Sequence, residues 1–205
     1  MDEWLNIVIR QITLYVLPVI ISLTLVCLIE KRYTHSAIPH PFFAIAWRGT
    51  WWPFLASVFF TRGMIFALPN PLKSGVKPAF TRFSAHFILT IFGLILYTWS
   101  LSHQAPTGLP PLHHWWAKVL MFFNLCMLGI HLLPLPNLLL GEYLMTQRHK
   151  HRALNLYVQQ LTSQRCLWLI SLLAASPLID VSIGATVIFP IYEQLASLAN
   201  HFQNL

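Results

Sequence analysis

Long apolar runs are the feature that most constrains how this chain folds. A helix needs roughly 20 apolar residues to cross the hydrocarbon core of a bilayer. Runs near that length cover residues 12–29, 51–68, 84–101, 119–145 and 166–190. Of the 205 residues, 56% are hydrophobic and 9% are charged, whereas roughly 25% are charged in an ordinary soluble domain. The sequence therefore predicts an all-α integral membrane protein, one polytopic domain over 1–205, and excludes a soluble enzyme.

The second apolar run is not predicted to span the membrane. It contains Arg62 together with Pro53 and Gly63, and a lone arginine at mid-membrane costs about 3 kcal/mol on insertion scales. We interpret residues 36–75 as a membrane-associated cytoplasmic insertion, either re-entrant or strand-rich. Five spans are the alternative. The preferred interpretation has four spans, at 12–29, 84–101, 119–145 and 166–190.

Basic residues set the predicted orientation. The segment 30–83 carries seven Lys or Arg and one acid, and 146–165 carries four basic residues and no acid. The segment 102–117 has no charged residue. Because cytoplasmic loops are rich in Lys and Arg, both basic segments are predicted to lie inside and the N-terminus outside. This topology explains the net charge of +7, so we predict a lipid bilayer and no nucleic acid as partner.

Two amphipathic segments are predicted to lie on the membrane surface. The segment 150–163 has basic neighbours and is expected on the anionic inner leaflet. Its apolar stripe consists of Leu154, Tyr157, Val158 and Leu161. The segment 191–205 is expected on the outer face. Its stripe at helical spacing consists of Ile191, Leu195, Leu198, Phe202 and Leu205.

The third predicted span ends in an unusual string, His-Leu-Leu-Pro-Leu-Pro-Asn-Leu-Leu-Leu-Gly-Glu-Tyr-Leu, at 131–144. Two prolines two positions apart break the hydrogen-bond ladder of a helix. Inside a membrane such a break is tolerated only where protein or a cavity covers the backbone. Pro134 and Pro136 therefore predict an irregular, protein-covered site close to the cytoplasmic side.

This string resembles the third motif of site-2 proteases, which are intramembrane zinc metalloproteases. Their motif runs Asn-x-x-Pro-x-Pro-x-x-Asp-Gly, and its Asp is a zinc ligand. Here His131 stands at the Asn position, Pro134 and Pro136 match, and Leu139 and Leu140 replace Asp and Gly. The resemblance extends to an insertion with three dipeptides in the same order, Gly49-Thr50, Asn70-Pro71 and Lys77-Pro78. It implies a site-2-protease-like core and suggests a bacterial inner membrane.

The catalytic motif of that family has no counterpart here. Site-2 proteases need His-Glu-x-x-His on the first core helix, where two histidines bind zinc and the glutamate activates water. The corresponding segment 22–30 contains no histidine, and no two histidines of the chain are four residues apart. We therefore predict a pseudoenzyme without catalytic residues, bound metal or other cofactor. The resemblance implies a scaffold, regulator or subunit that binds other membrane proteins around His131, Pro134, Pro136 and Asn137.

Three alternative functions stay open. An active zinc protease with displaced ligands would use His131 and Glu142, with His35 or His40. A small transporter or channel would use Asp180, because ionisable residues inside a membrane are functional unless they have a partner. A subunit of a respiratory complex is the third, in which two histidines on different spans would hold a haem.

The same polar residues also have structural interpretations. His131 is expected to bond the carbonyls that the prolines leave free, and His86 to face cytoplasmic water at the start of the second span. Asp180 is expected to cap a helix that restarts after Pro177. Glu142 is expected to be a solvated residue facing Arg148 or Lys150, and Glu30 to be a boundary charge that snorkels towards water.

Overall fold

The computed structural model describes residues 2–35, 52–60, 62–68, 73–103, 109–147, 152–161 and 164–203. In this part of the chain all regular structure is helical, which confirms the all-α part of the predicted fold class. The elements in chain order are α1 (Asp2–Thr34), α3 (Trp52–Phe59), α4 (Val76–Ser102), α5 (Leu112–His131), α6 (Leu139–Gln147), α7 (Arg152–Leu161), α8 (Gln164–Ala175), the π-helical η2 (Asp180–Ile188) and α9 (Phe189–Gln203).

Three helical segments of the described chain are long and apolar enough to cross a membrane. They are Glu3–Thr34, Val76–Ser102 and Asp180–Phe202. The first two contain the predicted spans 12–29 and 84–101. The chain is therefore a helical protein with the segments that membrane insertion requires.

The last predicted span has the wrong boundaries. Within 166–190, α8 ends at Ala175 and the chain turns at Ser176 and Pro177 before η2 begins. η2 and α9 then continue without interruption to Gln203. The predicted interfacial helix 191–205 is thus the second half of a long helix. Pro177 ends α8 because it cannot donate to the helical ladder, whereas no such break separates η2 from α9.

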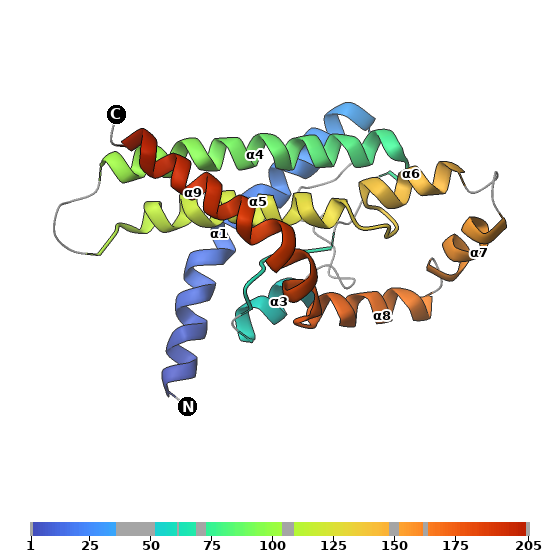
Figure 1. Ribbon diagram of the computed structural model, residues 1–205, viewed down its shortest axis with the longest axis horizontal. Coiled ribbons are helices and arrows are strands. Elements are labelled where there is room, and N and C mark those ends of the chain that lie inside the picture. The colour runs from blue at the N-terminus through green and yellow to red at the C-terminus, as the bar shows by residue number, and fades with distance from the viewer. Residues whose placement is uncertain are drawn as a thin grey trace.

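Helices α4 and α5 run antiparallel through the centre of the molecule (Figure 1). The two helices approach closely at Gly93 of α4, which has no side chain. A Cβ atom at this position would lie 2.7 Å from the backbone nitrogen of Met121 in α5. Helix α5 is enclosed by its neighbours, with 13 of its 20 residues buried. It therefore tolerates polar residues that a lipid-facing helix would avoid.

Helix α1 changes direction near its middle. Its N-terminal part points away from α4 and α5, while its C-terminal part runs behind them (Figure 1). Pro18 lies within this helix and removes one hydrogen bond of the ladder, which is a common cause of kinks. The indole Nε1 of Trp116 in α5 donates to the carbonyl oxygen of Thr13 at 3.2 Å, so α5 holds α1 close to the bend.

The described part of the predicted insertion lies in the protein core. Helix α3 has eight residues, far fewer than the roughly 20 of a spanning helix, and residues 62–68 are irregular. Five apolar side chains of this part are at most 4% exposed and pack in the main core cluster, namely Phe54, Val58, Met64, Ile65 and Phe66. Three others, Trp52, Phe59 and Phe60, are 52%, 41% and 75% exposed. Residues 52–60 and 62–68 thus form an insertion without strands, of which one side packs inside the molecule.

Candidate functional site

The helix break predicted at the two prolines is present. Helix α5 ends at His131, residues 132–138 form turns, and α6 begins at Leu139. Asn137 has a φ angle of 68°, a left-handed conformation that Asn adopts more readily than most residues. A Cβ atom at Gly141 would lie 1.8 Å from the carbonyl oxygen of Leu135. Helix α6 therefore folds back onto the break only because glycine stands there.

Two carbonyl groups of the break are bound by side chains from other helices. Arg82 of α4 donates from Nη2 to the carbonyl oxygen of Asn137 at 2.7 Å. The hydroxyl of Tyr157 in α7 donates to the carbonyl oxygen of Pro134 at 3.1 Å. Backbone groups that a proline break leaves unpaired need such partners where water is absent. The prediction that protein covers this break holds in part, because residues 133–137 are partly buried whereas Leu132 is 57% exposed.

The amide groups of the break are bound by His131 and Glu142. Nδ1 of His131 accepts the amide N–H of Leu139 at 3.3 Å. The Glu142 carboxylate accepts the amides of Asn137 at 3.2 Å and Gly75 at 2.7 Å. The expectation that His131 bonds a free carbonyl is wrong, because its ring nitrogen accepts a hydrogen bond from a backbone amide. The expectation of a solvated Glu142 is also wrong: it is 3% exposed, since α6 and the residues before α4 enclose it.

Arg82 also forms a buried ion pair with Glu30 of α1. The distance from Nη1 to Oε1 is 2.6 Å, and the two side chains are 3% and 2% exposed. The prediction of a snorkelling Glu30 is therefore wrong, because α4 brings a cation to it inside the protein. A buried ion pair persists when its geometry is good and further hydrogen bonds satisfy its remaining groups. The bond to Asn137 is one of these.

His86 lies in a hydrogen-bonded group that joins α1, α4 and α5. Its Nδ1 is 2.8 Å from Oδ1 of Asn124, and Nδ2 of Asn124 donates to Oγ of Ser22 at 2.8 Å and to the carbonyl oxygen of Leu120 at 2.7 Å. His86 is 1% exposed. The expectation that it faces water is wrong, because α5 covers this side of α4. The ring centroids of His86 and His131 are 5.9 Å apart.

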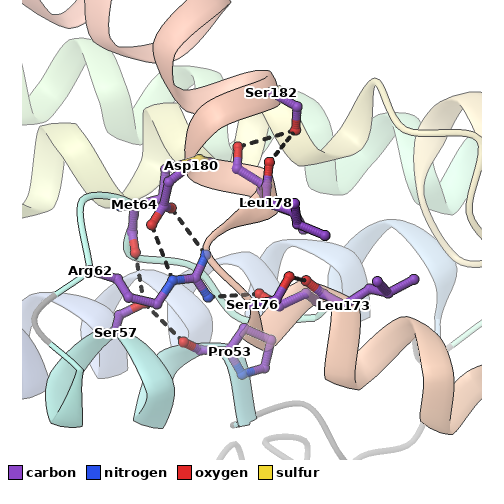
Figure 2. A network of polar contacts seen from close by, with 11 residues as sticks. Pro53, Ser57, Arg62, Met64, Leu173, Ser176, Leu178, Asp180 and Ser182 are labelled. Carbon is purple, nitrogen blue, oxygen red and sulfur yellow. Dashed lines mark hydrogen bonds and ion pairs between the residues drawn. The ribbon is translucent and has the colours of Figure 1, made fainter.

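Arg62 and Asp180, which the sequence analysis treated as isolated charges, are partners. Nε of Arg62 donates to Oδ2 of Asp180 at 3.1 Å and Nη2 to Oδ1 at 3.0 Å, while Nη1 donates to the carbonyl oxygen of Ala174 at 2.8 Å. Figure 2 shows the guanidinium between the end of α8 and the start of η2. Asp180 also accepts the amide of Met64 at 3.2 Å. The expectation that Asp180 caps the restarting helix is wrong, because η2 has no side-chain cap and this carboxylate binds the insertion instead.

No group of three or more His, Cys, Asp or Glu residues in the described parts of the chain is placed to hold a metal ion. Around the break, three atoms that could bind a metal ion already accept hydrogen bonds. Nδ1 of His131 and both oxygens of Glu142 bind backbone amides. His35 is exposed at the end of α1, and His40 lies outside the described residues.

Comparisons of the chain with protein-family models, with curated proteins and with solved structures give no match in any of the three. The resemblance to site-2 proteases therefore depends on the motif residues themselves. Those residues lie together in the fold: His131 is buried at the end of α5, and Pro134, Pro136 and Asn137 are partly buried in the turns that follow.

Sequence reasoning missed four residues that build this site: Arg82, Asn124, Gly141 and Tyr157. Asn124 had a usable signal, because an amide in the middle of an apolar run needs a partner when it is buried. Arg82 had a signal as well, since it stands one helical turn before His86 on the same face of α4. Gly141 and Tyr157 had none, because their contacts depend on how α6 and α7 fold back.

Proposed function

We propose that this chain is a non-catalytic, site-2-protease-like membrane protein that binds other membrane proteins at its helix break. The observation that carries the proposal is the way the break is held. Side chains from α4, α5, α6 and α7 bind its backbone groups in one conformation. An irregular backbone that is held so completely offers a partner a preorganised surface, which reduces the entropy lost on binding.

Apolar side chains next to the break supply the contact surface. Leu132 is 57% exposed, Leu140 is 38% exposed and Tyr143 is 51% exposed. Tyrosine is enriched at protein interfaces, because it combines a large apolar ring with a polar group. We propose these three side chains as the contact residues for a partner.

The use of the polar groups at the break supports a non-catalytic role. A zinc protease needs free lone pairs on its metal ligands. In this chain Nδ1 of His131 and the carboxylate of Glu142 accept hydrogen bonds from backbone amides. These groups stabilise the fold of the break in place of a metal centre.

We further propose that α5 crosses the membrane together with the three apolar segments, with the N-terminus outside, in a bacterial inner membrane. Its 20 residues match the length of a span. Its polar Asn124 faces Ser22 and His86, so lipid is not required to solvate it. The charge pattern of the segments between the helices supports this orientation.

Photo-crosslinking from single positions tests the proposed surface. A photoreactive phenylalanine analogue replaces Leu132 or Tyr143 in the full-length chain within its native membrane. The control position is Ile95 on α4, which is 59% exposed and stands 13 residues after Arg82 in the sequence, roughly 20 Å along the helix. We expect a discrete crosslinked protein from the two break positions, and loss of its co-purification in Leu132→Ser but not in Ile95→Ser. Equal products at all three positions would contradict the proposal.

Two further measurements separate the alternative functions. One zinc ion per purified chain, with chelator-sensitive cleavage of a membrane protein, would indicate an active protease. Ion or proton flux that disappears in Asp180→Asn, with unchanged stability of the fold, would indicate a transporter or channel.

A further inference from the structure

Two buried N–H groups beside the break have no hydrogen-bond partner within the described structure. They are Nε of Arg82 and Nε2 of His131. Arg82 is 2% exposed and His131 is 0% exposed. A buried donor that makes no hydrogen bond destabilises a protein, because it has lost its bonds to water without replacement. A ligand that accepts hydrogen bonds at this place removes that penalty.

The hydrogen bond of His131 defines which of its nitrogens carries the proton. Nδ1 accepts the amide N–H of Leu139, so it presents a lone pair. In a neutral imidazole the other nitrogen then carries the hydrogen. Nε2 of His131 is therefore a donor, and in this state it has no lone pair for a metal ion.

His86 has the opposite tautomer. The amide nitrogen of Asn124 donates to Ser22 and to the carbonyl oxygen of Leu120, which orients its Oδ1 towards His86. Because Oδ1 only accepts, Nδ1 of His86 carries the hydrogen. Nε2 of His86 therefore presents a lone pair, and its ring centroid is 5.9 Å from that of His131.

Arg82 belongs to the same place in the fold. It stands four residues before His86, hence on the same face of α4. It also binds the carbonyl of Asn137, two residues before the Leu139 amide that binds His131. The three residues thus lie close together: the rings of His86 and His131 are neighbours, and Arg82 and His131 bind backbone groups two residues apart.

We propose that one buried water molecule occupies this place, accepts from Nε of Arg82 and Nε2 of His131, and donates to Nε2 of His86. Three hydrogen bonds are typical of a buried water. An anion has no hydrogen for His86, and the charge of Arg82 is already balanced by Glu30. The water completes a hydrogen-bonded chain from Ser22 of α1 to the first residue of α6.

Solid-state NMR of the full-length protein in lipid bilayers, with ¹⁵N-labelled histidine and arginine, tests this site. We expect transfer of proton polarisation from water to Nε of Arg82 and to Nε2 of His131. Arg62 is the matched control, because it is also buried but its Nε donates to Asp180. The ¹⁵N chemical shifts of the imidazole rings should show that the hydrogen is on Nε2 in His131 and on Nδ1 in His86. Absent transfer at Arg82, or a hydrogen on Nδ1 of His131, would overturn the proposal.

A variant and a metal titration sharpen the result. In His86→Leu the water loses its acceptor, so the transfer to Arg82 should fall to the level of Arg62. Transfer that stays at the wild-type level would show that His86 does not bind the water. Zinc addition should leave the His131 signals in place, whereas a zinc-dependent loss of the Nε2 hydrogen would show a metal site. The wild-type measurement stands by itself if the variant does not fold.

Discussion

Among the described residues, proline marks two breaks between helices, and an arginine that pairs with an acid stabilises both. At residues 132–138, Arg82 donates to the carbonyl of Asn137 and pairs with Glu30. At the turn between α8 and η2, Arg62 donates to the carbonyl of Ala174 and pairs with Asp180. In each case one guanidinium from a distant part of the sequence satisfies a backbone carbonyl beside the break and pairs with an acid. Glu30 is far from the first break in the sequence, whereas Asp180 lies directly after the second.

The two breaks differ in how completely the arginine is used. Arg62 directs Nε, Nη1 and Nη2 at protein groups, and its partner carboxylate is 15% exposed. Arg82 leaves Nε without a protein partner, and its acid is 2% exposed. The Arg62 clamp is closed and structural. The Arg82 clamp leaves a donor for a ligand beside the surface that we propose for partner binding.

The largest expected effect comes from breaking the more buried pair. Arg82→Met leaves the Glu30 carboxylate buried without its cation, and such changes destabilise by about 3–5 kcal/mol. The double variant Glu30→Met with Arg82→Met should recover most of this loss. Denaturant unfolding in bicelles measures both. Equal stabilities of the single and double variants would contradict this account of the clamp.

Asp180→Asn tests the second clamp and should have a smaller effect. The amide keeps the shape but removes the charge, and a hydrogen bond to a charged group contributes about 1.5–3 kcal/mol. Water can partly solvate the group, so we expect a loss at the lower end of this range. The same unfolding measurement applies, with Ser182→Ala of η2 as the control because its side chain is exposed and bonds only within its own helix. A loss as large as that of Arg82→Met would remove the distinction between the two clamps.

Gly141→Ala tests the packing of α6 on the first break. The new Cβ would lie 1.8 Å from a backbone oxygen, and overpacking of this kind destabilises by about 1–3 kcal/mol. Gly63→Ala is the control near the second break, where the new Cβ would meet the Phe189 ring at 2.9 Å and the ring can move. We expect the larger fall in thermal stability for Gly141→Ala. The reverse order would show that the first break is the softer one.

Tyr157→Phe should have the smallest effect. It removes one hydrogen bond, to the carbonyl of Pro134 at 3.1 Å, on an exposed side chain, and a neutral bond contributes about 0.5–1.5 kcal/mol. Global stability should change little. Amide hydrogen exchange in α7 should become faster, while exchange in α5 stays unchanged. Faster exchange across α5 would mean that α7 supports the whole break.

Local patterns were sufficient for the class of protein and for the break at Pro134 and Pro136, whereas the predicted span 166–190 ran across the break at Pro177. The length of the apolar runs predicted a helical membrane protein, and a proline has no amide hydrogen wherever it lies, so Pro134 and Pro136 predicted the break before α6. Arg62 and Pro53 likewise predicted that residues 51–68 do not form a spanning helix. The resemblance to site-2 proteases remains a property of the motif at 131–138.

Tertiary structure alone decided which charges meet. Glu30 and Arg82 are 52 residues apart, and Arg62 and Asp180 are 118 apart, so no local periodicity relates them. The environments of His86 and Glu142 were predicted wrongly for the same reason, since other segments bury them. The sequence by itself determined the helical class and the end of α5 before Pro134, because both depend on neighbouring residues. Packing decided which polar groups are buried, because a group's partners come from distant parts of the chain.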